Sequence, residues 1–173
     1  MKKSYLIFIT FIFLSSCNSI VKTIYDDTTA RYNAYFIANE EIKNIEEDYE
    51  KNLNQGFDSL IDLTYKIDTN QVSSIQERTQ NSIEKLSILI QRQTTSKYVY
   101  PSYALIGKSR LLNLNLKEAI TTLKYVNSKS NNNEANTMAL VYLLRAYTEN
   151  KDYNSAQEVD KFLTNKEMNE NLK

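Results

Sequence analysis

The side chains that could perform chemistry here are carboxylates, lysines, tyrosines and hydroxyls, because the 173 residues include no His and a single Cys. Composition therefore excludes an intrachain disulfide, a Cys/His zinc site and a Ser-His or Cys-His nucleophile. Carboxylates cluster at 40–41 and 46–48. They lack the loop of a calcium site, and adjacent helix positions point apart. We interpret them as a solvated helix face, and we predict no catalytic residue, no metal and no cofactor.

The single cysteine, Cys17, ends a segment that has the features of an export signal. Two lysines precede an apolar run at 5–14, which is the length of a signal-peptide core and short for a bilayer span. The run ends in Leu14-Ser15-Ser16-Cys17, which resembles the lipobox of bacterial lipoproteins. The resemblance implies that residues 1–16 are a signal peptide and that Cys17 carries lipid, at about 0.8 kcal/mol per buried CH₂. An ordinary secretory signal, or a buried core cysteine, is the alternative.

Composition favours an all-α fold for the rest of the chain. Only two Gly and one Pro are present, too few for the tight turns of a sheet-rich protein. Pro101 suits the first turn of a helix whose Tyr103, Ile106, Gly107, Arg110 and Leu111 share one face. Asn115 and Glu118 can form a capping box for a second helix, which buries residues 119–126. Such a hairpin cannot cover its own apolar side and needs neighbours.

A second hairpin follows at a regular interval. Ala119 and Ala156 occupy equivalent places 37 residues apart, close to the period of about 34 of tetratricopeptide repeats. The first unit resembles that family through Gly107, Leu116 and Ala119, and the second through Tyr147, Tyr153 and Ala156. Residues 98–164 are therefore predicted to be two tetratricopeptide-like repeats, followed by a frayed tail at 165–173.

A less regular hairpin is expected before these repeats, within residues 28–97. A helix from 28 to about 54 has one apolar stripe, and a second helix at 72–95 has another. Asp26, Asp27 and Thr28 are candidate caps after a polar tether at 17–27. Gly56 can end the first helix, and a docked loop fills 55–71. The fold class predicted is thus an α-solenoid of about three helical hairpins.

A more specific resemblance begins at Asp27-Thr-Thr-Ala-Arg-Tyr-Asn-Ala-Tyr-Phe36, shortly after the lipobox. This order of elements looks like the tetratricopeptide-repeat lipoproteins of type IX secretion and gliding motility in Bacteroidota, the PorW/SprE family. The resemblance implies a scaffold on the periplasmic face of the outer membrane. It implies protein partners from the secretion or envelope machinery and attachment to the membrane through Cys17. Members of that family continue well beyond this length with more repeats.

Two sets of residues are candidate partner-binding positions. In repeats of this kind the first helices line the concave face, which would carry Lys108, Leu111, Leu112, Arg145, Thr148 and Glu149. Such a groove could take an extended peptide or a partner helix. The alternative is a solvated face with Leu111 and Leu112 in the core.

The second set is Arg31, Tyr32, Asn33 and Tyr35, near the membrane-proximal end of the chain. An Arg among aromatic residues is a plausible interface anchor. An Arg stacked on a Tyr to fix the first hairpin explains the same residues equally well.

Charge and composition limit the classes of function. The chain has 21 basic and 21 acidic residues, so it lacks the basic field that a nucleic-acid binder needs. No Gly-rich phosphate loop occurs, and we expect no small-molecule substrate and no enzyme. The leading hypothesis is a scaffold lipoprotein in type IX secretion. The alternative is a generic periplasmic module that binds peptides or proteins unrelated to secretion.

Overall fold

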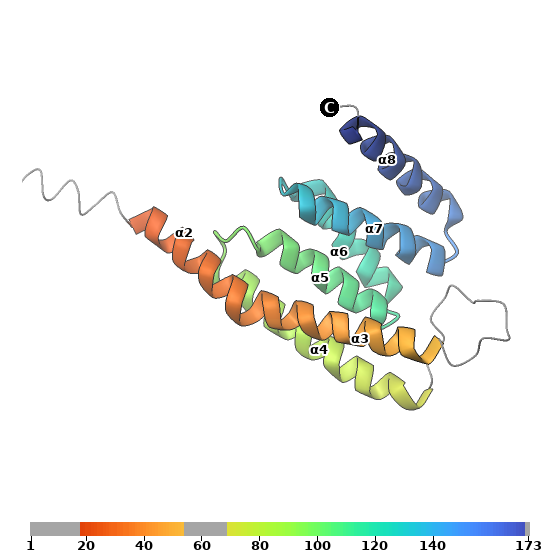
Figure 1. The fold of residues 1–173 in the computed structure, drawn as a ribbon, viewed down its shortest axis with the longest axis horizontal. Coiled ribbons are helices and arrows are strands. Elements are labelled where there is room, and N and C mark those ends of the chain that lie inside the picture. Colours follow the sequence, from red (N-terminus) through yellow and green to blue (C-terminus); the bar gives the residue numbers. More distant parts are fainter. Residues whose placement is uncertain (1–17, 54–68, 172–173) are drawn as a thin grey trace, which may run out of the picture.

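The computed structural model describes residues 18–53 and 69–171, and every regular element in these two ranges is helical (Figure 1). The predicted all-α class is therefore confirmed for the described residues. The predicted signal peptide at 1–16, Cys17 and Gly56 lie outside them. None of the described helices is both long and apolar enough to cross a bilayer.

From α4 to α8 the helices follow one another with short connections. In chain order they are α2 (Asn18–Thr29), the π-helix η1 (Ala30–Tyr35), α3 (Phe36–Leu53), α4 (Thr69–Arg92), α5 (Val99–Leu112), α6 (Leu116–Lys129), α7 (Asn133–Glu149) and α8 (Tyr153–Asn171). Pro101 falls in the first turn of α5, as predicted.

The helices α3 to α8 pack as three consecutive hairpins, α3 with α4, α5 with α6 and α7 with α8. The first helices of the hairpins also touch one another, since α3 packs on α5 and α5 packs on α7. Each second helix packs on the first helix of the following hairpin. Figure 1 shows the resulting row, with α5 at its centre and α8 at one end.

Three apolar clusters run along this row instead of one central core. The largest joins α3, α4 and α5 and contains Ala38, Ile42, Ile45, Tyr49, Ile75, Leu86, Leu105, Ile106 and Leu112. The second joins α5, α6 and α7, and the third is small, formed by Leu111, Ala119 and Ala146. The stripes predicted for the first two helices are confirmed where their side chains are described, because each hairpin buries its apolar side on the next.

The turns inside the second and third hairpins have the same backbone structure, 37 positions apart. Leu114 has φ of 58° and Lys151 has φ of 60°. The N–H of Asn115 donates to Arg110 O at 2.9 Å, and that of Asp152 donates to Tyr147 O at 2.9 Å. Both are Schellman turns, in which a left-handed residue satisfies the last carbonyls of a helix. The interval of 37 residues between Ala119 and Ala156 therefore also separates two turns with the same backbone conformation.

The N-terminal boundary differs from the prediction. Helix begins at Asn18 and continues through η1 into α3, so the polar tether predicted up to residue 27 is helical from Asn18. Asp26, Asp27 and Thr28 lie inside α2 and cap nothing. Thr28 instead donates its hydroxyl to Ile24 O at 2.8 Å, and the two carboxylates bind the turn between α4 and α5. A tertiary partner has replaced the local cap.

Two other local predictions are corrected. Asn115 precedes α6 but makes no side-chain cap, and Glu118 lies 3.4 Å from Nε of Arg110 instead of reaching back. Helical backbone also continues to Asn171, through most of the segment at 165–173 that was expected to fray. In the first case Glu118 has a charge partner, Arg110 on α5, in place of the capping contact. In the second case the α8 backbone stays helical where fraying was predicted.

Candidate functional site

Lys108 lies in the interior and not on a concave surface. Its side chain is 10% exposed and its Nζ lies 2.6 Å from Oε2 of Glu46 on α3. The same Nζ is 4.9 Å from the centre of the Tyr142 ring on α7. Burial alone would lower the pKa of Lys108, but hydrogen bonds to Glu46 and Tyr142 outweigh burial, and the pKa is raised. Lys108 therefore joins three first helices through charge and cannot reach a partner.

Leu111 and Leu112 are also in the core, with 1% and 2% of their surface exposed. The assignment of these two residues to a binding face is wrong, and the alternative of core residues is correct. The physical reason is that α5 has helices on several sides, with α3 and α7 along the row and α4 and α6 packed against it. The Tyr49 hydroxyl donates a hydrogen bond to Leu112 O at 3.1 Å, which ties α3 to the last residue of α5.

The other three residues of the first set lie on α7 and remain partly or fully accessible. Arg145 Nε donates to Oε1 of Glu149 at 2.8 Å, one helical turn away. Thr148 is exposed, and its hydroxyl donates to Leu144 O at 2.8 Å. An ion pair of this type on one helix stabilises by only a few tenths of a kcal/mol. The predicted groove is therefore split, with Lys108, Leu111 and Leu112 buried and the α7 residues at the surface.

The second predicted set lies on η1, where it does not form one exposed patch. Arg31 and Asn33 are exposed, whereas Tyr35 is half-buried and its ring centre lies 5.0 Å from that of Tyr98. Burial, followed by the nearby Glu134, raises the pKa of Tyr35 to about 12. Tyr35 therefore helps to fix η1 against the start of α5. For Tyr32 only the backbone position, inside η1, is described.

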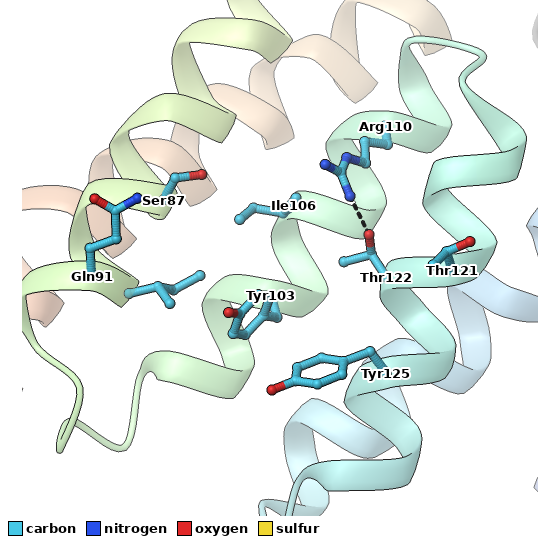
Figure 2. Close-up of a pocket in the computed structure, with 9 residues that line it drawn as sticks. Ser87, Gln91, Tyr103, Ile106, Arg110, Thr121, Thr122 and Tyr125 are labelled. Atoms are coloured by element: carbon cyan, nitrogen blue, oxygen red, sulfur yellow. Dashed lines mark hydrogen bonds between the residues drawn. The ribbon is translucent and has the colours of Figure 1, made fainter.

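A groove that the sequence analysis did not identify lies between α4 and α6, with α5 as its floor (Figure 2). It encloses about 510 Å³ and is lined by Ser87, Ile90, Gln91, Tyr103, Ile106, Arg110, Thr121, Thr122 and Tyr125. The ring of Tyr103 meets that of Tyr125 edge-on, with centres 5.1 Å apart. Burial, followed by the proximity of Tyr125, raises the pKa of Tyr103. Arg110 donates to the Thr122 hydroxyl at one end of the groove.

This groove has an apolar floor, two aromatic rings and a hydroxyl-rich rim. Such a surface can accept an apolar or aromatic side chain of a peptide. The hydroxyls of Ser87, Thr121 and Thr122 each donate to a carbonyl of their own helix. The available signal in the sequence was Tyr125, an aromatic residue on the polar side of α6 with 42% of its surface exposed. No group of three His, Cys, Asp or Glu side chains gathers as a metal site in residues 18–53 and 69–171.

Comparisons of the chain with protein-family models, with curated proteins and with solved structures find no match.

Proposed function

We propose that this chain is a lipid-anchored scaffold whose three hairpins form a tetratricopeptide-like solenoid and hold other envelope proteins together. The observation that carries the proposal is the pair of equivalent turns at Leu114 and Lys151. Each turn has one residue in the left-handed conformation and the same backbone hydrogen bonds, and the two turns are 37 positions apart. A structural repeat requires such equivalence. The contacts from α3 to α5 to α7 support the same proposal.

A row of hairpins favours binding over chemistry. It exposes a long surface for its size, and repeat arrays use such surfaces to hold partners. The two cations with raised pKa values in the described residues support this reading, because Lys108 and Arg78 are each tied to carboxylates of α3 in structural ion pairs. The chain thus acts as a scaffold and not as an enzyme.

The place of this scaffold follows from the two resemblances described for the sequence. The lipobox supports attachment to a membrane through lipid on Cys17. The likeness of residues 27–36 to the PorW/SprE family supports a location on the periplasmic face of the outer membrane and a role in type IX secretion and gliding motility. Its partners are then subunits of the secretion translocon or other envelope proteins.

The test combines a deletion with a pull-down. Deleting the gene should stop secretion of type IX cargo and gliding, and a Cys17→Ser variant should restore neither. Crosslinked membranes should yield translocon subunits with the wild-type chain. Normal secretion in the deletion strain, with no translocon subunit captured, would reject this function.

A second candidate function, a peptide-binding module unrelated to secretion, is favoured by the groove between α4 and α6. Tyr125→Ala removes one of its two aromatic rings, whereas Tyr153→Ala removes an exposed ring on α8 as a matched control. If the module binds peptides there, peptides selected from a library should lose affinity only with Tyr125→Ala. Equal peptide affinity of the two variants would exclude the groove as the peptide-binding site.

A further inference from the structure

The first described helix, α2, exposes its apolar side chains instead of burying them. Ile20, Val21, Ile24 and Tyr25 have exposed fractions of 65%, 55%, 61% and 67%. Positions i, i+1, i+4 and i+5 of an α-helix lie on one side. These four residues are called the α2 stripe below. Figure 1 shows α2 projecting from one end of the helical row.

The opposite side of α2 is polar, and this is the side that faces the protein. Asp26 is 4% exposed and accepts a hydrogen bond from the Thr95 hydroxyl at 2.7 Å. Asp27 accepts from the Ser96 hydroxyl at 2.9 Å and from the Lys97 N–H at 2.8 Å. A surface helix normally turns its apolar side inward. In α2 this arrangement is reversed.

The π-helix η1 joins α2 and α3 into one continuous rod. Ala30, at the start of η1, and Ala38, in α3, are both fully buried, as expected for positions i and i+8 on one side of a helix. The continuous rod therefore presents polar groups of α2 and apolar groups of α3 to the same body.

We propose that the α2 stripe lies in the interfacial region of a phospholipid bilayer, parallel to its surface. The proposal rests on the membrane attachment in the proposed function. The residues directly before α2 carry two lysines, an apolar run at 5–14 and Cys17. If Cys17 carries acyl chains, the membrane attachment is three residues before Ile20, and if the apolar run stays in the membrane, its end at Leu14 is six residues before Ile20.

The chemistry of α2 fits this occupant. Helices of this type bury an apolar side about 5–10 Å into the headgroup and acyl boundary. Tyr25 places an amphipathic ring where tyrosines concentrate in membrane proteins. Lys22 lies off the stripe and is exposed, so its ammonium can meet lipid phosphates. A second copy of the chain is a poorer occupant, because a stable interface commonly engages about 20–30 residues on each side and the stripe has four.

The consequence is a fixed orientation of the scaffold. A lipid on a flexible tether leaves a domain free to turn. A helix embedded along its length and continuous with α3 holds the row of hairpins at one angle to the membrane. Asp26 and Asp27 add a second attachment between α2 and the α4–α5 turn, and this attachment resists bending at η1.

The test uses the absence of tryptophan from the sequence. Three full-length variants, Tyr25→Trp, Lys22→Trp and Lys161→Trp, place a single reporter on the stripe, beside the stripe on α2 and on α8. Each is produced with its leader in a lipoprotein-processing bacterium and reconstituted in vesicles of phosphatidylethanolamine and phosphatidylglycerol with brominated acyl chains. Mass spectrometry of each preparation determines whether Cys17 is acylated.

The expected result is a blue-shifted, strongly quenched emission for Tyr25→Trp, with weak quenching for Lys22→Trp and none for Lys161→Trp. Adding Ile20→Ser and Ile24→Ser should abolish the quenching at position 25, and circular dichroism should show the same helix content because both residues are exposed. Equal, weak quenching at all three positions in a vesicle-bound, acylated protein would reject insertion of the α2 stripe in the bilayer, while the lipid anchor at Cys17 would stand. Quenching at position 25 with an unacylated Cys17 would keep the stripe and reject the lipid anchor. A blue shift that depends on protein concentration and not on lipid would overturn the proposal in favour of self-association.

Discussion

The helices α2 and α5 handle polar and apolar atoms in opposite ways. In α5 ten residues are buried, including charged and hydroxyl side chains, since other helices pack along several of its sides. In α2 the buried side is polar and the apolar side is exposed. The buried charged groups of both helices have partners, since Lys108 binds Glu46 and Asp26 binds Thr95, whereas the buried hydroxyl of Ser102 on α5 has none. The difference teaches that the apolar side of a helix need not face the protein interior, and for α2 the proposed apolar neighbour is lipid.

The charge pair in the middle of the row should give the largest effect. Glu46→Ala leaves the ammonium of Lys108 buried without its carboxylate, which should cost about 2–4 kcal/mol of unfolding free energy. Lys108→Met, the matched variant, removes the charge and keeps an apolar chain near Tyr142, so it should cost less. Urea denaturation measures both. Equal losses would mean that the buried charge itself carries no penalty.

The same pair predicts a pH dependence at the alkaline end. Because the pKa of Lys108 is raised above its usual 10.5 in the folded protein, its contribution is complete below pH 10.5. The contribution is lost as pH rises through the folded pKa. The stability difference between wild type and Lys108→Met should therefore be constant from neutral pH to about pH 10 and shrink above it. A difference that shrinks between pH 6 and 8 would show that another group controls the pair.

Close packing of α5 on α6 gives the next effect. A Cβ on Gly107 would lie 2.5 Å from Cδ2 of Leu123, a fully buried side chain. Gly107→Ala should destabilise by about 1–2 kcal/mol, since the overpacking cost exceeds the gain in helix propensity. Thermal unfolding measures this change. The double variant Gly107→Ala with Leu123→Ala should lose less stability than the sum of the losses in the two single variants. Strict additivity would contradict the contact.

On the α2 side, Asp26→Ala removes the buried acceptor of the Thr95 hydroxyl. The expected loss is about 1–2 kcal/mol, confined to α2 and η1 because these elements lie at the end of the row. Amide hydrogen exchange should accelerate there and stay unchanged in α5. Asp26→Asn keeps an acceptor and should accelerate exchange less. Faster exchange throughout the chain would show that α2 is coupled to the core as tightly as α5.

The smallest effect concerns the repeated turns and has the opposite sign. Leu114→Gly and Lys151→Gly replace side chains held at positive φ by the residue that adopts this conformation freely. Each should stabilise the protein by about 0.5–1 kcal/mol in chemical denaturation. Leu114→Ala keeps the conformational cost and serves as the control. Destabilisation by either glycine would mean that the two turns are not the equivalent structures described.

Local periodicity predicted the helices well and their surroundings poorly. Ile42 and Ile45 could be placed in a core from their spacing, because an amphipathic stripe must be covered by something. Asp26 and Asp27 looked like caps because acidic residues before an apolar stripe commonly are. Their true partners at residues 95–97 are about seventy positions away, a pairing that no local pattern encodes. The groove around Tyr103 and Tyr125 was missed for the same reason, as three helices form it.

By itself the sequence determined the all-helical class, the spacing of 37 residues between equivalent positions of two hairpins and the lack of His-based chemistry. These follow from residue type and interval alone, since helix periodicity and turn chemistry act over a few neighbours. Only the tertiary structure decided that Lys108 and Leu111 are buried while Ile20 and Ile24 are exposed. Burial depends on how many elements surround a helix, and that number is set by contacts between distant parts of the chain.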